Sequence, residues 1–160
     1  MSVTTDSLHR ASDTTHHPAH ERCVVCGSRN HRSLNLPFCR GDDGWVEATL
    51  TGDESLQGYP HMMHGGVISL LLDAAMTHCL FAHGCTGVTA RMELKFRHPV
   101  MVNERVHIRA KLVRASPPAY QLKAELLQHE QVKTSATGLF VDRPELIAQE
   151  TDACHNPSPE

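Results

Sequence analysis

Residues 64–83 read HGGVISLLLDAAMTHCLFAH, and this stretch decides the fold. From Val67 onward it contains no proline and no glycine, and it is longer than a typical strand. It therefore predicts a helix that opens at the two glycines and closes at Gly84. Apolar side chains surround most of the predicted helix axis, whereas a surface helix shows one apolar stripe. The sequence thus predicts a central helix that other elements wrap.

Four segments after the helix alternate apolar and polar residues, which is the period of a strand with one buried face. These segments are 88–96, 106–112, 120–126 and 132–140. Before the helix, residues 34–38 and 45–50 form a predicted hairpin around the Gly41–Gly44 turn. Short connections favour antiparallel neighbours. The predicted fold class is α+β, with the order β-β-α-β-β-β-β and one long helix against a curved six-stranded antiparallel sheet.

Length and composition favour one soluble domain. The chain has 160 residues, of which 40% are hydrophobic and 21% are charged, as in ordinary globular proteins. The formal net charge of -3 gives no general attraction to nucleic acid or anionic lipid, so neither nucleic acid nor membrane is expected as a partner. No stretch approaches about 18 consecutive apolar residues and no export signal is recognisable, which predicts a cytoplasmic protein.

The two ends of the chain differ from its middle. Residues 1–22 carry almost no large apolar side chain and predict a disordered tail, because they cannot offset the entropy of ordering by burial. Residues 143–160 contain three prolines and no sustained periodicity, which indicates a flexible C-terminal tail. The folded domain is therefore expected over residues 23–142.

A cysteine pair follows the predicted N-terminal tail. Cys23 and Cys26 could bind zinc together with His31 and Cys39, but this set lacks a second closely spaced ligand pair. Four histidines flank the pair: His16, His17, His20 and His31. We interpret the cysteines as unligated thiols and predict neither a metal nor a cofactor.

Three short motifs in this element order are similar to a known family. They are GYP at 58–60, HGG at 64–66 and, after six further residues, DAA at 73–75. Over about residues 23–142 the chain resembles the hotdog-fold acyl-CoA thioesterases of the phenylacetate-degradation and 4-hydroxybenzoyl-CoA type. The resemblance implies a hotdog fold, hydrolysis of an acyl-CoA or related thioester, and catalysis by the carboxylate eight positions after the first glycine, which is Asp73 here. It also implies that Thr89, at the start of the next strand, lines the site.

The chain departs from that family at two positions. Many relatives carry Asn or Gln seven residues before the first glycine of HGG, to help hold the thioester; Gly58 stands there, and Gln57 one place earlier. We take Gln57 and Gly58 as candidate substrate-binding residues. Close relatives often carry a second acid after the catalytic one, where this chain has Ala74, so Asp73 is the single acid of the predicted helix.

Thioester chemistry explains why such residues stand together. The first amides of a helix lack intrahelical partners and can stabilise an oxyanion. We assign this role to the amide of Gly65, with Gly66 as a second candidate and His64 positioning the turn. A carboxylate in an apolar helix has a raised pKa, so Asp73 can act as a general base toward water or as a nucleophile. Thr89, on the polar face of its strand by parity, can hydrogen-bond Asp73 or the water.

The spacing of these groups predicts an assembly. Eight residues of helix separate Gly65 from Asp73 by about 12 Å, which is too far for both to serve one carbonyl. Two chains related by a two-fold axis solve the problem, because Gly65 of one can face Asp73 of the other. The resembling family uses this arrangement, so we expect a homodimer with shared active sites, or a homotetramer built from two such dimers.

Other roles stay open at the level of sequence. Arg91, Lys95 and Arg97 could bind coenzyme A phosphates, or could form the solvent face of their strand. A hotdog dehydratase or hydratase is an alternative, since Asp73 and His78 stand five apart as in a hydratase dyad. A non-catalytic acyl-CoA-binding protein is another alternative, although it would need an effector domain.

Overall fold

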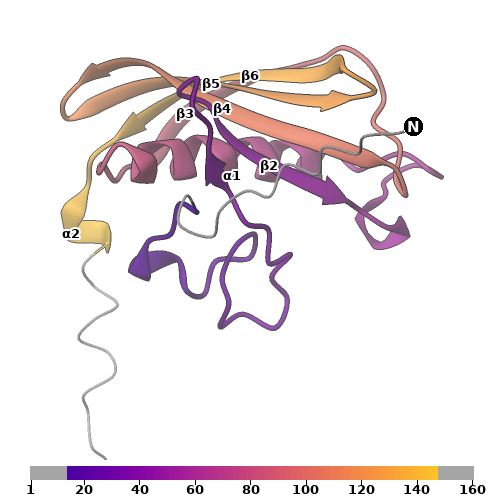
Figure 1. The fold of residues 1–160 in the computed structure, drawn as a ribbon, viewed down its shortest axis with the longest axis horizontal. Coiled ribbons are helices and arrows are strands. Elements are labelled where there is room, and N and C mark those ends of the chain that lie inside the picture. The colour runs from indigo at the N-terminus through magenta and orange to yellow at the C-terminus, as the bar shows by residue number, and fades with distance from the viewer. Residues whose placement is uncertain (1–13, 148–160) are drawn as a thin grey trace, which may run out of the picture.

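The computed structural model describes residues 14–147 and contains one sheet, one long helix and a few short helical turns (Figure 1). In chain order the elements are η2 (Pro18–His20), β1 (Cys39–Arg40), β2 (Val46–Thr51), η3 (Glu54–Leu56), α1 (Gly65–Ala82), β3 (Val88–Phe96), β4 (Arg105–Ser116), β5 (Ala119–Gln128), β6 (Gln131–Val141) and α2 (Pro144–Ile147). This order confirms the prediction of two strands, a helix and four strands.

The six strands form one antiparallel sheet in the order β1-β2-β4-β5-β6-β3. Helix α1 lies across one face of this curved sheet (Figure 1). The strand that follows the helix, β3, pairs only with β6 and so forms one edge of the sheet. The sheet therefore wraps the helix as predicted, and β3 carries an unpaired row of backbone groups.

Helix α1 supplies the centre of the core. Leu71, Leu72, Met76 and Leu80 are fully buried and pack with side chains from the inner face of the sheet, which include Ile108, Leu122, Leu126 and Phe140. By length and composition alone α1 could cross a membrane, but half of it is buried inside the protein. The apolar composition of α1 is thus that of a helix in the protein core.

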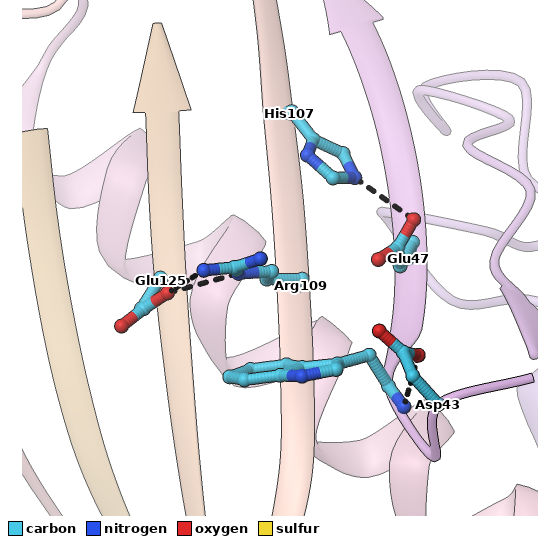
Figure 2. Close-up of polar contacts among 6 residues, drawn as sticks. Asp43, Glu47, His107, Arg109 and Glu125 are labelled. Atoms are coloured by element: carbon cyan, nitrogen blue, oxygen red, sulfur yellow. Dashed lines mark hydrogen bonds and ion pairs between the residues drawn. The ribbon is translucent and has the colours of Figure 1, made fainter. Parts of the chain in front are cut away.

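The outer face of the sheet is polar. Arg109 donates to the Glu125 carboxylate from Nε at 2.9 Å and from Nη2 at 2.6 Å, and its guanidinium lies 4.5 Å from the centre of the Trp45 ring (Figure 2). On the same strand as Arg109, His107 Nε2 lies 3.1 Å from Oε2 of Glu47, which belongs to the neighbouring strand β2 (Figure 2). Because Ile108 and Ala110 on either side of Arg109 are fully buried, the alternation expected of a one-sided sheet is present in β4.

The first strand begins after the segment predicted for it and is shorter. Residues 34–38 are not a strand; the regular pairing of β1 covers only Cys39 and Arg40. The amides of Leu34 and Leu36 instead donate to the carbonyls of Val24 and Val25, at 3.0 and 2.9 Å. Val25 is 1% exposed, so its burial holds this segment against the preceding loop and away from the sheet.

The structure also differs from the prediction at the N-terminal boundary. The sequence predicted a tail through residue 22, but the amide of Thr15 donates to the carbonyl of Phe38 at 2.8 Å, and the ring of His20 packs edge-on against Phe81 at 4.9 Å. Residues 14–22 lie along α1 because histidine and threonine find aromatic and polar partners there. Residues 143–147 include α2, and the remaining parts of both predicted tails lie outside the described residues.

Candidate functional site

The start of α1 leaves one backbone donor without a partner. His64 caps the helix: its Nδ1 accepts the Gly66 amide at 2.8 Å, and its carbonyl accepts the amides of Val67 and Ile68 at 2.9 and 3.1 Å. Within residues 14–147 the Gly65 amide has no hydrogen-bond acceptor. Of the two glycine amides predicted to hold an oxyanion, Gly65 is thus available and Gly66 is engaged by the histidine cap.

A cavity of about 770 Å³ opens at this helix start. Its lining includes Gly65, His64 and Gly58 together with Phe96 and Arg97 from the end of β3 and the following turn. Phe96 is 55% exposed although it belongs to the apolar face predicted for its strand. The cavity is large enough for part of a drug-sized ligand, and it presents one amide donor, one guanidinium and an apolar wall.

Asp73 lies two turns along the same helix, in a different setting. Its Oδ1 accepts a hydrogen bond from the Thr89 hydroxyl at 2.6 Å. Burial raises the pKa of the Asp73 carboxyl, and the Thr89 hydrogen bond lowers it by a smaller amount. The neutral form is favoured by low solvation, and the charged form by the hydroxyl. The structure therefore brings together Asp73 and Thr89, two residues named from the sequence.

A β-bulge explains how Thr89 reaches the helix. The pairing of β3 with β6 shifts between Thr89 and Arg91, so Ala90 is the extra residue. Thr89 pairs with Phe140, which is fully buried and faces the core. Without the bulge, Thr89 would share the outward face of Arg91, as strict alternation predicts. Sequence parity placed Thr89 on the polar face, and the bulge instead turns its hydroxyl toward Asp73.

The remaining named residues divide between the cavity and other positions. The side-chain oxygen of Gln57 accepts the His61 amide at 3.1 Å and closes the local turn; Gln57 is not part of the cavity lining, whereas Gly58 is. Arg97 lines the cavity, while Arg91 and Lys95 line two smaller depressions elsewhere on the sheet, the second of which Arg97 also lines. Of Arg91, Lys95 and Arg97, only Arg97 lines the cavity at the helix start.

His78 points away from Asp73. It is 2% exposed, and its Nδ1 lies 2.8 Å from the Thr15 hydroxyl and 3.0 Å from the Thr15 carbonyl. Its ring stacks on Phe38 with centroids 4.4 Å apart. Burial lowers the pKa of His78 to about 4, so the ring is neutral near pH 7. The pair that resembles a hydratase dyad in the sequence thus has no shared site in the structure.

One cluster of metal-ligand types forms within residues 14–147, and it differs from the set considered above. It comprises His20, Cys23 and Cys26, whose ligand atoms all lie within 4.8 Å of one another. His31 and Cys39 are not part of it. The ligand set considered from the sequence did not include His20, which was named there only as one of four histidines that flank the cysteine pair.

Comparison with known proteins agrees with this architecture. The sequence model of the thioesterase superfamily matches residues 61–117. Acyl-coenzyme A thioesterase THEM4 of Bos taurus is 26% identical over 106 residues, which are 65% of this chain and 44% of that protein. The crystal structure of RHA08564, a thioesterase superfamily protein, has a TM-score of 0.69 at 29% identity and covers 73% of this chain and 61% of that one.

A hypothetical thioesterase from Streptococcus pneumoniae TIGR4, solved with coenzyme A, has a TM-score of 0.63 at 19% identity and covers 68% of this chain and 88% of that one. The present chain spans less than two thirds of both THEM4 and RHA08564. The superfamily match includes HGG at 64–66 and Asp73, and the two structural matches each cover more than two thirds of this chain. The chain therefore has the hotdog thioesterase fold that its sequence pattern predicted.

Proposed function

We propose that this protein hydrolyses acyl-CoA thioesters, with the Gly65 amide as oxyanion donor and Asp73 as the catalytic carboxylate. The observation that carries the proposal is the Asp73–Thr89 pair at 2.6 Å on an otherwise apolar helix. Partial burial of a carboxylate costs folding free energy, and side chains kept in such surroundings are often functional. The superfamily match and the acyl-CoA thioesterase relative support the same reaction class.

The proposed reaction uses water and groups that the protein itself supplies. Asp73 accepts a proton from water, the resulting hydroxide attacks the thioester carbonyl, and the oxyanion is stabilised by the Gly65 N–H. Collapse of the tetrahedral intermediate breaks the C–S bond. The thiol has a pKa near 8.5, so it leaves as a thiolate without a strong acid. Direct attack by Asp73 to give an anhydride, which water then hydrolyses, uses the same two groups.

The two groups belong to one site only if two chains contribute. Gly65 and Asp73 are separated by about 12 Å of helix, and the cavity at the helix start is not lined by Asp73. The β3 edge, with exposed Phe96 beside that cavity, offers a pairing surface. We propose a homodimer in which Gly65 of each subunit faces Asp73 of the partner, so that two equivalent sites form.

The His-Gly-Gly turn and the position of Asp73 support the phenylacetate-degradation type within the superfamily. Arg97 at the cavity mouth is the proposed contact for an anionic group of coenzyme A, because a guanidinium binds phosphate with several parallel hydrogen bonds. Gly58 lets substrate approach the backbone beside it.

Thiol release from a panel of short, long and aromatic acyl-CoAs tests the activity. We expect turnover of at least one class by the wild type, and loss of more than nine tenths of it in Asp73→Asn, which keeps the shape of the side chain. Circular dichroism serves as the folding control. No turnover of any acyl-CoA by folded protein, or more than a tenth of wild-type activity in Asp73→Asn, would contradict the proposal.

Subunit complementation tests the shared site separately. Co-expressed Asp73→Asn and Gly65→Pro chains should form heterodimers in which one site carries both lesions and the other carries neither. Such heterodimers should recover up to about half of the wild-type activity per dimer. Verified heterodimers that stay as inactive as their parents, or an active monomer in sedimentation, would refute the shared site.

A further inference from the structure

The loop before β1 holds a constellation that the proposed thioesterase reaction does not use. Cys23 and Cys26 lie on one tight turn, and the turn η2 brings His20 over them, with His20 Nδ1 3.7 Å from Cys26 Sγ. The three ligand atoms lie within 4.8 Å of one another, and all three side chains are half-buried. We propose that His20, Cys23 and Cys26 form a Zn²⁺ site with three protein ligands and one exchangeable position.

The distances suit a tetrahedral zinc ion. Zn–S bonds of about 2.3 Å and Zn–N bonds of about 2.0 Å place the ligand atoms of such a site roughly 3.5–3.8 Å apart. The observed 3.7 Å between nitrogen and sulfur falls in that range. Two thiolates neutralise the charge of Zn²⁺, and a neutral imidazole completes a common donor set. Small side-chain rotations thus suffice to bind the ion.

The turn is built to present both sulfurs to one side. The Val25 amide donates to Cys23 Sγ at 3.4 Å, a contact that orients the sulfur. The Gly27 amide donates to the Cys23 carbonyl at 2.9 Å. A Cβ on Gly27 would lie 2.4 Å from the Cys23 nitrogen and 2.6 Å from the Glu21 carbonyl oxygen, so only glycine fits after the second cysteine.

Packing against the core and against α1 also holds the cluster in place. Val25, between the cysteines, is 1% exposed and anchors the loop in the core. The ring of His20 packs edge-on against Phe81 at 4.9 Å and against His78 at 6.0 Å, both from α1. A ligand set whose rings and backbone are already fixed loses less entropy on metal binding than a set on a free loop.

The proposed site lies near the part of α1 that carries Asp73. His20 lines a cavity of about 250 Å³ together with Thr77 and Val88. The Thr77 hydroxyl donates to the Asp73 carbonyl at 3.1 Å, and Val88 precedes Thr89. Because all three ligands belong to residues 20–26, zinc would make that loop more rigid where it packs near this part of α1.

Metal binding by untagged, reduced protein tests the site directly. After exposure to Zn²⁺ and removal of excess ion, we expect about one equivalent per chain by mass spectrometric metal analysis. Co²⁺ in place of zinc should give the strong visible bands of a tetrahedral ion and the thiolate charge-transfer bands of Cys ligation. Zinc should raise the melting temperature by at least about 3 °C.

Matched variants separate this cluster from other cysteines and histidines. Cys26→Ser and His20→Gln should weaken Zn²⁺ binding at least tenfold, whereas Cys39→Ser and His17→Gln, which change residues outside the cluster, should bind as the wild type does. Less than about a tenth of an equivalent in reduced wild type would overturn the proposal. Full binding by Cys26→Ser would overturn it as well.

Alkylation of the cysteines in the wild-type protein tests the zinc site even if a variant does not fold. Zinc should protect Cys23 and Cys26 from iodoacetamide, mapped by peptide mass, and leave Cys39 and Cys85 as reactive as in the metal-free protein. Equal labelling of Cys23 and Cys26 with and without zinc would refute the site. A Cys23–Cys26 disulfide in the isolated protein, followed by no zinc uptake after reduction, would do the same.

Discussion

The start and the middle of helix α1 present different groups. The start, its open end, follows an exposed capping histidine, presents the backbone amide of Gly65 and opens into a cavity of about 770 Å³. The middle of the helix carries Asp73, whose side chain is partly buried and accepts a hydrogen bond from the Thr89 hydroxyl. Farther along the helix, His78 and Phe81 pack against residues from before β1.

In the proposed mechanism, this one helix supplies both an oxyanion donor and a general base. An oxyanion donor at a helix start is a backbone group, so it needs small neighbouring residues and an open approach. A general base is a side chain, so its pKa depends on what covers it. About 12 Å of helix (about eight residues) separates the two groups, which is the reason for proposing that a second subunit completes each site.

The largest expected effect comes from removing the donor at the open end. Gly65→Pro lacks the amide hydrogen, and proline is tolerated in the first helical turn, so the fold should persist. We expect a fall in kcat of about 100- to 1000-fold. Gly65→Ala is the matched control, because its Cβ would meet Phe96 only at an ordinary 3.6 Å. Near-wild-type activity in the proline variant would remove Gly65 from the site.

Next to Asp73, Thr89→Val removes a hydroxyl at nearly constant shape. Its hydrogen bond lowers the pKa of Asp73, so the variant should have a still higher pKa there. Because the base acts only when ionised, the acidic limb of the pH–rate profile should move to higher pH. The loss of activity should therefore be largest on the acidic side of the profile. Thr89→Ser should restore the wild-type profile, and an unchanged acidic limb in Thr89→Val would separate Thr89 from the catalytic carboxylate.

Replacing the cap of the open end should mainly affect stability. His64→Ala leaves the Gly66 amide without its acceptor, which should lower the free energy of unfolding by about 1 kcal/mol. His64→Asn, with a preferred capping side chain, should recover most of that loss. Denaturant unfolding measures both. Equal stability of wild type and His64→Ala would mean that the cap contributes nothing to the fold.

The smallest effect is a gain in stability when Asp73 is replaced. The folded-state pKa of Asp73 is raised by burial, so its contribution to stability is fully present below the unfolded pKa and is lost as pH rises through the folded pKa. Asp73→Asn avoids burying a charge and should therefore melt at a higher temperature than the wild type near pH 7. The difference should shrink on acidification. A variant that melts lower at neutral pH would contradict the raised pKa.

Local sequence patterns were sufficient for most of the fold and for part of the site. Period-2 alternation identified β3 to β6, and the glycine-free apolar run identified α1, because both signals arise within one element. Asp73 stood out as the single acid of that run, and Gly65 as a residue of the helix start. These features depend on neighbours in the chain, so the chain itself reveals them.

Features that depend on distant neighbours were decided only by the tertiary structure. The bulge at Ala90 reverses the parity of Thr89, since pairing with β6 determines which residue is extra. Burial of Val25 draws residues 34–36 away from the predicted hairpin, and packing on Phe81 brings His20 to the cysteines. Local backbone geometry depends on neighbouring residues, so the sequence determines the order of the elements and the period of each one. Side-chain partners instead follow from contacts that form only when the helix packs on the sheet.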